Sequence, residues 1–241
     1  MCHTEANAAL PLPDRADMIV EAGITAFTFG SVDASRRIVL IPDIYGTTPF
    51  YRGLATWFAK RDASVWLVDP FAEFGELPQP TKEAAFARRH KVRDLSYVDA
   101  LERFIRGRQV SGVVGFCLGG LFVFDLARRG VSAGMVSLYG FPQGMPNQDP
   151  LPIPFDYLEG LPATHTAVFG EADYLQTPES LERLKTIAHR TPSFSVKIYP
   201  KSGHGFLADL GSEDPVLRAN AQDALLLCGN ILAPCRDAAL H

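Results

Sequence analysis

Short runs of apolar and β-branched residues alternate along the chain with longer segments in which apolar residues recur every three to four positions. The short runs predict strands buried on both faces, and the longer segments predict helices that bury one side. We expect strands at 25–29, 37–41, 64–68, 112–116, 134–139, 166–169 and 195–199. We expect helices at 51–60, 95–105, 118–129, 178–189 and 215–232.

This regular alternation predicts an α/β fold, a mainly parallel sheet covered by helices on both faces. No internal repeat or low-complexity tract divides the 241 residues, so we expect one domain over 1–241. The proline-rich stretch 141–154 is interpreted as a loop over the sheet edge. Residues 1–20 are expected to form a flexible or peripheral N-terminal segment.

Composition and charge exclude several function classes. The chain is 47% hydrophobic and 21% charged with a net charge of −4, which offers no basic field for nucleic acid. No run approaches the roughly 18 apolar residues of a membrane span, and the first residues do not resemble a secretion signal. We therefore expect a cytoplasmic protein, a monomer or small homo-oligomer, with neither nucleic acid nor membrane as partner.

The four cysteines fit neither a disulfide framework nor a paired zinc motif, so reduced thiols are expected. Cys228 lies in an apolar helical run and is interpreted as a core residue, while Cys2 and Cys235 lie near the chain ends. Cys117 is different because it directly follows a predicted strand.

Four residues that can carry chemistry follow predicted strands. Asp43, Cys117, Asp173 and His204 each come just after a different strand. Because ligands gather at the carboxyl ends of parallel strands, we expect these side chains to meet at one edge of the sheet. The order along the chain is Cys, Asp, His.

Cys117 stands in "GVVGFCLGG", where Gly115 and Gly119 flank it at two-residue spacing. G-x-C-x-G predicts a sharp turn from strand to helix, in which small neighbours allow the backbones to approach closely. The first turn of the predicted helix 118–129 also favours a thiolate. The alternative is that these glycines only allow a strand and a helix to pack closely around a buried cysteine.

His204 lies in a glycine-flanked loop, "SGHGF", where an imidazole can exchange protons near neutral pH. A solvated loop histidine is the alternative. The other histidines fit a catalytic role less well, since they lie at termini, in helices or at a strand start: His3, His90, His165, His189 and His241.

Asp173 is the candidate to orient the His204 ring, because a carboxylate in the preceding loop can accept its second N–H. A helix or turn cap is the alternative role for Asp173, and Glu171 is a second candidate for the acid.

Taken together, these residues resemble the dienelactone hydrolases, α/β-hydrolases with a cysteine nucleophile. The resemblance rests on G-F-C-L-G-G around Cys117, on Asp173, and on G-H-G-F around His204, and it covers nearly the whole chain. It implies an α/β-hydrolase fold and hydrolysis of an enol lactone or small ester through an acyl-cysteine, with no metal or organic cofactor. A broad carboxylesterase or thioesterase, or a non-catalytic ligand-binding or redox-sensing homologue, remains the alternative.

The resemblance also implies a further acid after the early strand, where this chain has Asp43-Ile44-Tyr45-Gly46 in place of a glutamate-led segment. In the family this acid contacts and helps ionise the thiol, whereas a plain turn-capping role is the alternative for Asp43. The fold implies an oxyanion hole made by the backbone N–H groups of Ile44 and Leu118.

Specificity departs from the family pattern, because the position four residues after the catalytic histidine holds Ala208 where relatives use an arginine. Arg88 and Arg89 are candidate cations for a substrate carboxylate, although a surface role is the alternative. The remaining candidates for lining the substrate pocket are aromatic residues that also suit the core: Tyr45, Phe74, Phe86, Tyr139 and Phe206.

Overall fold

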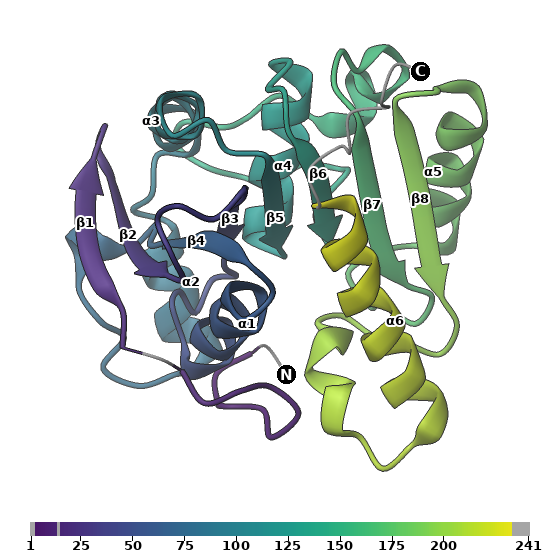
Figure 1. Ribbon diagram of the computed structural model, residues 1–241. Coiled ribbons are helices and arrows are strands. Elements are labelled where there is room, and N and C mark those ends of the chain that lie inside the picture. The colour runs from purple at the N-terminus through teal and green to yellow at the C-terminus, as the bar shows by residue number, and fades with distance from the viewer. Residues whose placement is uncertain (1–2, 14, 233–241) are drawn as a thin grey trace, which may run out of the picture.

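An eight-stranded sheet forms the centre of the molecule in the computed structural model, which describes residues 3–13 and 15–232 (Figure 1). The strand order is β1-β2-β4-β3-β5-β6-β7-β8, with antiparallel pairing of β1 with β2 and β2 with β4, and parallel pairing elsewhere. The strands are β1 (Asp17–Glu21), β2 (Ile24–Phe29), β3 (Arg36–Ile41), β4 (Ala63–Val68), β5 (Gly112–Phe116), β6 (Gly134–Leu138), β7 (His165–Gly170) and β8 (Phe194–Tyr199).

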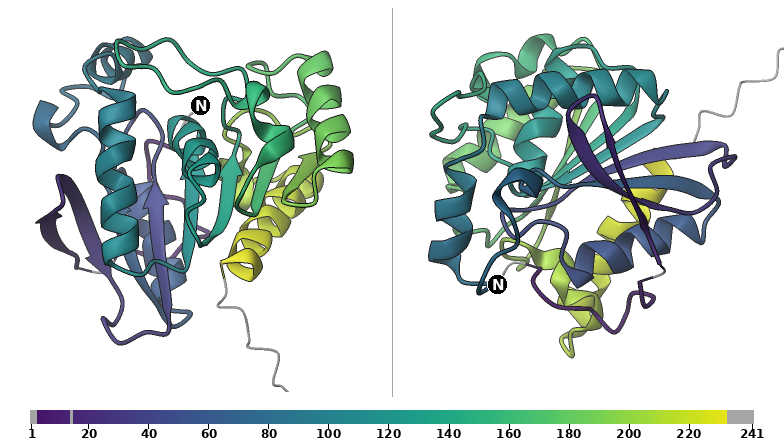
Figure 2. Two further views of the ribbon diagram at one scale, coloured as in Figure 1. Left: turned by 90° about the horizontal axis from the view of Figure 1, so that it is seen from above. Right: turned by 90° about the vertical axis from the view of Figure 1, so that its left-hand side faces the viewer.

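Helices cover both faces of this sheet. Helices α1 and α6 lie on one face, and α3, α4 and α5 lie on the other (Figure 2). The α-helices are α1 (Pro49–Ala59), α2 (Lys82–Arg89), α3 (Asp94–Gly107), α4 (Leu118–Arg128), α5 (Pro178–Arg190) and α6 (Pro215–Ile231). Short 3₁₀ helices are η1 (Ala72–Phe74), η2 (Pro154–Asp156), η3 (Leu158–Gly160) and η4 (Phe206–Gly211). The predicted fold class is confirmed.

All seven predicted strands and five predicted helices are present, with ends displaced by two residues at most. The sequence pattern missed β1 and α2. Strand β1 is an edge strand without a fully buried position, so it lacks the apolar run of a central strand. Helix α2 has the sequence KEAAFARR, which is too short and too polar to show a clear apolar face.

The N-terminal segment differs from the flexible or peripheral one expected. His3 and Leu10 are buried, and β1 extends the sheet through pairing with β2. Cys2, Cys235 and His241 lie outside the described residues. The segment therefore contributes to the packed body of the protein, close to the edge where the candidate residues gather.

The strands that carry the candidate residues lie side by side in the sheet. Strands β3 and β5 are direct neighbours, and β7 and β8 form a second neighbouring pair. All four are parallel, so the loops after them meet at one edge.

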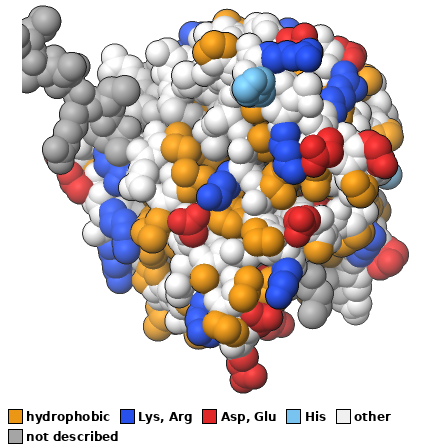
Figure 3. Space-filling view, turned by 90° about the vertical axis from the view of Figure 1, so that its right-hand side faces the viewer, with side chains coloured by type: hydrophobic (Ala, Val, Ile, Leu, Met, Phe, Trp, Pro, Cys, Tyr) orange, Lys and Arg blue, Asp and Glu red, His pale blue; other side chains and the backbone are white. Residues whose placement is uncertain are grey.

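Charges of both signs are interspersed on the surface. On the face that α5 and α6 share, basic and acidic side chains alternate with apolar ones (Figure 3). In the described part of the chain, none of the helices has the length and apolar character that crossing a bilayer requires.

Candidate active site

Cys117 occupies a tight turn between β5 and α4. Its backbone φ of 53° and ψ of −109° lie in a region that residues other than glycine rarely adopt. The turn is held by its own N–H, which donates to the Leu138 carbonyl of the neighbouring strand at 3.0 Å. The side chain is 5% exposed and faces a cavity at the carboxyl ends of the strands.

Two glycines make this turn possible. A Cβ atom on Gly115 would lie 2.1 Å from the Gly119 carbonyl oxygen, and one on Gly119 would lie 2.2 Å from the Ile41 carbonyl oxygen. Neither approach is sterically possible for alanine, so both positions require glycine. The predicted reason for the G-x-C-x-G spacing is therefore visible in the backbone itself.

His204 and Asp173 form a hydrogen-bonded pair. The Nδ1 atom of His204 lies 2.9 Å from the Oδ2 atom of Asp173, and both side chains are almost fully buried. The other oxygen, Oδ1, accepts the Leu175 N–H at 2.9 Å, so Asp173 also caps the turn that follows β7. Glu171, the second candidate acid, is exposed and accepts instead from the Lys201 N–H.

This pairing leaves the second ring nitrogen of His204 facing the cavity. Its Nε2 atom is buried and hydrogen bonds to none of the described residues. Cys117 and His204 line the same cavity. The cavity therefore contains both a thiol and an imidazole whose ring is oriented by a carboxylate.

Asp43 lies directly behind this cavity, with a side chain only 1% exposed. Its Oδ1 atom accepts the Tyr45 N–H at 2.8 Å, which is the capping bond of a tight turn. The Tyr51 hydroxyl and the His3 backbone N–H also favour the charged carboxylate, yet burial outweighs them and raises the pKa of Asp43 to about 6. The structure therefore shows the capping bond of Asp43, and its role toward the Cys117 thiol stays a prediction.

The cavity has a volume of about 370 Å³ and a mainly apolar lining. Ile44 lines it, as expected for a loop that offers a backbone N–H, while Leu118 is fully buried at the first turn of α4. The lining comprises Thr4, Ile44, Tyr45, Pro80, Lys82, Phe86, Cys117, Phe141, Met145, Tyr174, Leu175 and His204. Among the described residues, no cluster of three or more histidine, cysteine or acidic side chains could hold a metal ion.

Comparison with known proteins assigns the family. The profile of the dienelactone hydrolase family matches residues 24–232. The chain belongs to the dienelactone hydrolase family.

Curated relatives include carboxymethylenebutenolidase 2 of Cupriavidus pinatubonensis, 46% identical over 93% of this chain and 96% of the relative. A carboxymethylenebutenolidase of Rhodococcus opacus is 30% identical over 93% of both chains. A crystal structure of a putative dienelactone hydrolase from Klebsiella pneumoniae aligns with a TM-score of 0.72 at 17% identity, over 89% of this chain and 98% of that one. The predicted family, the α/β-hydrolase fold and the class of ester hydrolase are confirmed.

Arg88 and Arg89, predicted to bind the substrate, do not line the cavity that contains Cys117. Arg89 is 2% exposed and pairs with the buried Asp94 at 2.5 Å, so it does not line the cavity. Arg88 donates to the carbonyl oxygens of Ile44 at 3.3 Å and Tyr45 at 3.0 Å. It therefore fastens the loop that carries the predicted oxyanion donor, and it lines a different cavity from the one that contains Cys117.

Among the aromatic candidates, Tyr45 and Phe86 line the cavity and the others do not. Phe74 lines a separate surface pocket near α3. Tyr139 and Phe206 are fully buried, and the ring of Tyr139 contacts the His204 ring edge-on at a centroid distance of 5.2 Å. Phe206 packs in turn against the Tyr139 ring at a centroid distance of 5.9 Å.

Several residues at the site escaped the sequence reasoning. Lys82 lines the cavity from the missed helix α2, and Met145 lines it from the proline-rich loop. His3 shares a hydrogen bond of 2.6 Å with the Tyr139 hydroxyl across 136 positions of chain. No motif or periodicity marks these residues, because their role depends only on where the loops cross.

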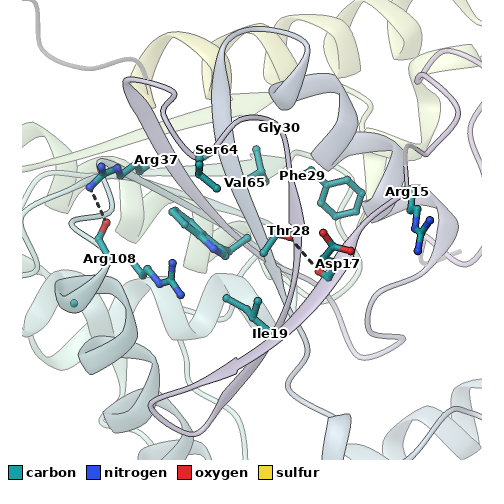
Figure 4. Close-up of a pocket in the computed structure, with 13 residues that line it drawn as sticks. Arg15, Asp17, Ile19, Thr28, Phe29, Gly30, Arg37, Ser64, Val65 and Arg108 are labelled. Carbon is teal, nitrogen blue, oxygen red and sulfur yellow. Dashed lines mark hydrogen bonds between the residues drawn. The ribbon is translucent and has the colours of Figure 1, made fainter.

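A second cavity, of about 490 Å³, lies at the opposite edge of the sheet, near the amino ends of β3 and β4 (Figure 4). Two of its arginines are already engaged: Arg37 donates to the Arg108 carbonyl oxygen at 3.3 Å, and Arg108 pairs with Glu21. The cavity that contains Cys117 is therefore the candidate active site.

Proposed function

We propose that this protein hydrolyses an enol lactone through an acyl-cysteine intermediate. The proposal agrees with the names of its relatives, the carboxymethylenebutenolidases. One observation carries the proposal. Cys117, in a strained turn, shares a single cavity with His204, whose ring is held by the buried carboxylate of Asp173. This is the arrangement of nucleophile, base and orienting acid that acyl transfer requires.

In the first half of the reaction, the Sγ atom of Cys117 bonds to the lactone carbonyl carbon after the thiol proton passes to a base. The N–H groups of Ile44 and Leu118 stabilise the negative oxygen of the tetrahedral intermediate. Collapse of this intermediate breaks the ring C–O bond and releases an enolate, which becomes a ketone when it takes up a proton at carbon. The acyl group remains on Cys117 as a thioester.

In the second half, the Nε2 atom of His204 takes a proton from water, and the resulting hydroxide attacks the thioester carbon. The C–S bond breaks and releases a carboxylic acid, which ionises in water, and the Cys117 thiolate takes back the proton held by His204 to restore the thiol. Asp173 holds the His204 ring in the tautomer that leaves Nε2 free to accept this proton.

Lys82 is proposed to bind a carboxylate on the substrate. Among the described residues that line the cavity, Lys82 is the sole lysine or arginine, and its ammonium lies 5.9 Å from the centre of the Phe86 ring. An ammonium at the rim of an apolar cavity attracts an anionic substrate group and leaves the lactone ring to the apolar lining. The cation predicted from Arg88 and Arg89 is thus assigned to a neighbouring position on α2.

The covalent step is tested by mass spectrometry of the quenched protein during turnover of a carboxymethylene-substituted enol lactone. We expect an adduct with the mass of the substrate on the peptide that contains Cys117, and Cys117→Ala should abolish both adduct and turnover without unfolding the protein. Cys117→Ser should lose several orders of magnitude in rate, since a hydroxyl has a far higher pKa than a thiol. Unchanged turnover by Cys117→Ala would contradict the proposal.

The role of Lys82 is tested by comparing the lactone with a neutral ester that lacks the carboxylate. Lys82→Met should raise KM for the anionic lactone by about fivefold, corresponding to the loss of one exposed charge contact of about 1 kcal/mol. The neutral ester should show the same KM with both proteins. A matched control is Lys185→Met, which removes an exposed lysine on α5.

Location and assembly are also proposed from the sequence. Within the described part of the chain, neither Cys117 nor Cys228 takes part in a disulfide, which suits the reducing cytoplasm. We propose that the protein acts there on a small molecule, as a monomer or small homo-oligomer without nucleic acid or membrane partners.

A further inference from the structure

The N-terminal segment crosses the loops that carry the candidate catalytic residues (Figure 1). The Thr48 hydroxyl, in the loop after β3, donates to the His3 carbonyl oxygen. Four residues further on, Asn7 donates to the carbonyl oxygen of Ala208 at 2.8 Å, in η4 just beyond His204. Residues 3–10 therefore tie the loop of Asp43 to the loop of His204.

The side chain of His3 is inserted into the aromatic wall behind the cavity. It is 3% exposed and stacks on the Phe50 ring at a centroid distance of 4.0 Å and an interplanar angle of 15°. Its Nε2 atom lies 2.6 Å from the Tyr139 hydroxyl. The Tyr139 ring in turn contacts the His204 ring, so the chain of contacts runs from His3 to the catalytic imidazole.

Tyr139 needs such a support. Its φ of 42° lies in the left-handed region, where a bulky residue is strained. The strain is tolerated only when surrounding contacts hold the residue, and the hydrogen bond to His3 is one of those contacts. Neighbouring Thr4 lines the substrate cavity, so the segment also forms part of the cavity wall.

The backbone of His3 contacts the second catalytic candidate. Its N–H lies beside the Asp43 carboxylate, which accepts the Tyr45 N–H at 2.8 Å and also has the Tyr51 hydroxyl nearby. Each of these groups favours the charged carboxylate against the burial that raises the pKa of Asp43 to about 6.

The charged and titratable groups that face Asp43 come from three other elements. They are Tyr51 on α1, Arg88 on α2 and His204 after β8. His3 adds no charge, because burial and the nearby His204 lower the pKa of its ring to about 3. The ring of His3 therefore acts as a neutral hydrogen-bonding group and its backbone as a donor.

We propose that residues 3–10 are a working part of the active site, in which the His3 ring holds Tyr139 against His204 and the His3 N–H holds the Asp43 carboxylate. His3 is thus a positioning residue. This inference rests on the proposed function, in which His204 exchanges protons, and on the role in ionising Cys117 that the family resemblance implies for Asp43. It assigns a role in the reaction to a segment outside the match with the family profile, which begins at residue 24.

The substitutions of His3 by Ala, Gln and Pro distinguish the role of the ring from the role of the backbone N–H. All proteins carry the purification tag at the C-terminal end. His3→Ala should lower kcat about 10–100-fold while KM changes little, because His204 loses its orientation. His3→Gln should recover most of this loss, since an amide can still bond to the Tyr139 hydroxyl. His189→Ala, which removes an exposed histidine on α5, is the matched control and should leave kcat unchanged.

His3→Pro removes the N–H as well as the ring. Loss of a bond to the charged form raises the pKa of Asp43, so the acid limb of the kcat/KM profile should move to higher pH by about one unit relative to His3→Ala. Alkylation of Cys117 by iodoacetamide, followed on its own peptide, should show the same displacement without any lactone. Circular dichroism and the melting temperature show whether each variant folds. If His3→Pro does not fold, the kcat values of His3→Ala and His3→Gln test the proposal.

The outcomes are distinguishable. A wild-type protein that does not hydrolyse the lactone contradicts the proposed function, while the alkylation profiles of the variants still test His3. Wild-type turnover with unchanged kcat in His3→Ala and an unchanged acid limb in His3→Pro would overturn the inference alone. Equal losses in His3→Ala and His3→Gln that follow their melting temperatures would show a merely structural role.

Discussion

At Asp43, two roles that seemed exclusive use different features of one side chain. The cap depends on one oxygen atom, Oδ1, which accepts the Tyr45 N–H. Help in ionising a thiol depends on charge, and burial has brought the pKa of Asp43 to about 6, close to the pH at which it must exchange a proton. Substitution of Asp43 by Asn, Glu or Ala therefore distinguishes the capping role from the role in ionising the thiol.

Asp43→Asn should lower lactone turnover about 10²–10⁴-fold, the range for losing an acid–base group. It should not lower the melting temperature, because asparagine keeps the capping oxygen and removes a buried charge. Asp43→Ala should lose turnover equally and about 1 kcal/mol of stability, whereas Asp43→Glu should keep substantial activity. Steady-state kinetics and thermal melts decide, and an unimpaired Asp43→Asn protein would limit Asp43 to capping.

The sequence predicted which residues gather at the strand ends better than it predicted which way the side chains on α2 point. Cys117, Asp173 and His204 were found because each follows a strand, and parallel strands bring their ends together whatever the side chains between them. Arg88 and Arg89 stand on one turn of α2, and only the packing of that helix decides that both turn away from the cavity. Lys82, six residues earlier than Arg88, faces the cavity instead.

At the scale of elements, burial determined what the sequence could predict. Strands β4 and β5 are buried at every position, and their apolar runs are unmistakable. Strand β1 lies at the sheet edge and α2 lies over the site, so neither shows a strong apolar pattern. The elements that shape specificity are thus the ones that carry the weakest signal.

The junction of β5 and α4 is expected to tolerate no added methyl group. Gly119→Ala should strongly destabilise the protein, because its Cβ would collide with the Ile41 backbone and force α4 away from β3. Gly107→Ala, in the last turn of α3 with no described atom within 4 Å of the new Cβ, should be neutral or stabilising by about 0.5–1 kcal/mol. Chemical denaturation measures both, and a stable Gly119→Ala protein would contradict this account of the turn.

At the scale of the whole molecule, contacts distant in sequence complete the site. His3 and Tyr139 meet across 136 positions, and no periodic pattern connects them. The sequence therefore predicted the sheet and the residues that end its strands, but not the segment that closes over them. Packing of that segment also places a second histidine, besides His165, in the interior.

Buried neutral histidines make the stability of the whole molecule depend on pH. His165, at the start of β7, is 2% exposed and bonds through Nε2 to the Ser137 hydroxyl at 2.8 Å. Burial lowers the pKa of its ring from 6.5 to about 3, so the folded protein binds this proton more weakly than the unfolded chain does. The contribution of His165 is therefore fully present above pH 6.5 and is lost as the pH falls towards 3.

His165→Gln isolates this contribution, because every other titrating group is shared with the wild type and cancels in the difference. The variant should be less stable than the wild type at pH 7.5, since the glutamine replaces a well-packed ring. That difference in unfolding free energy should shrink by about 2 kcal/mol at pH 5, where the wild type alone loses stability through the unfolded imidazole. Urea denaturation at both pH values measures it, with His189→Gln on α5 as the exposed control. A difference that stays constant between the two pH values would show that His165 is charged in the folded protein.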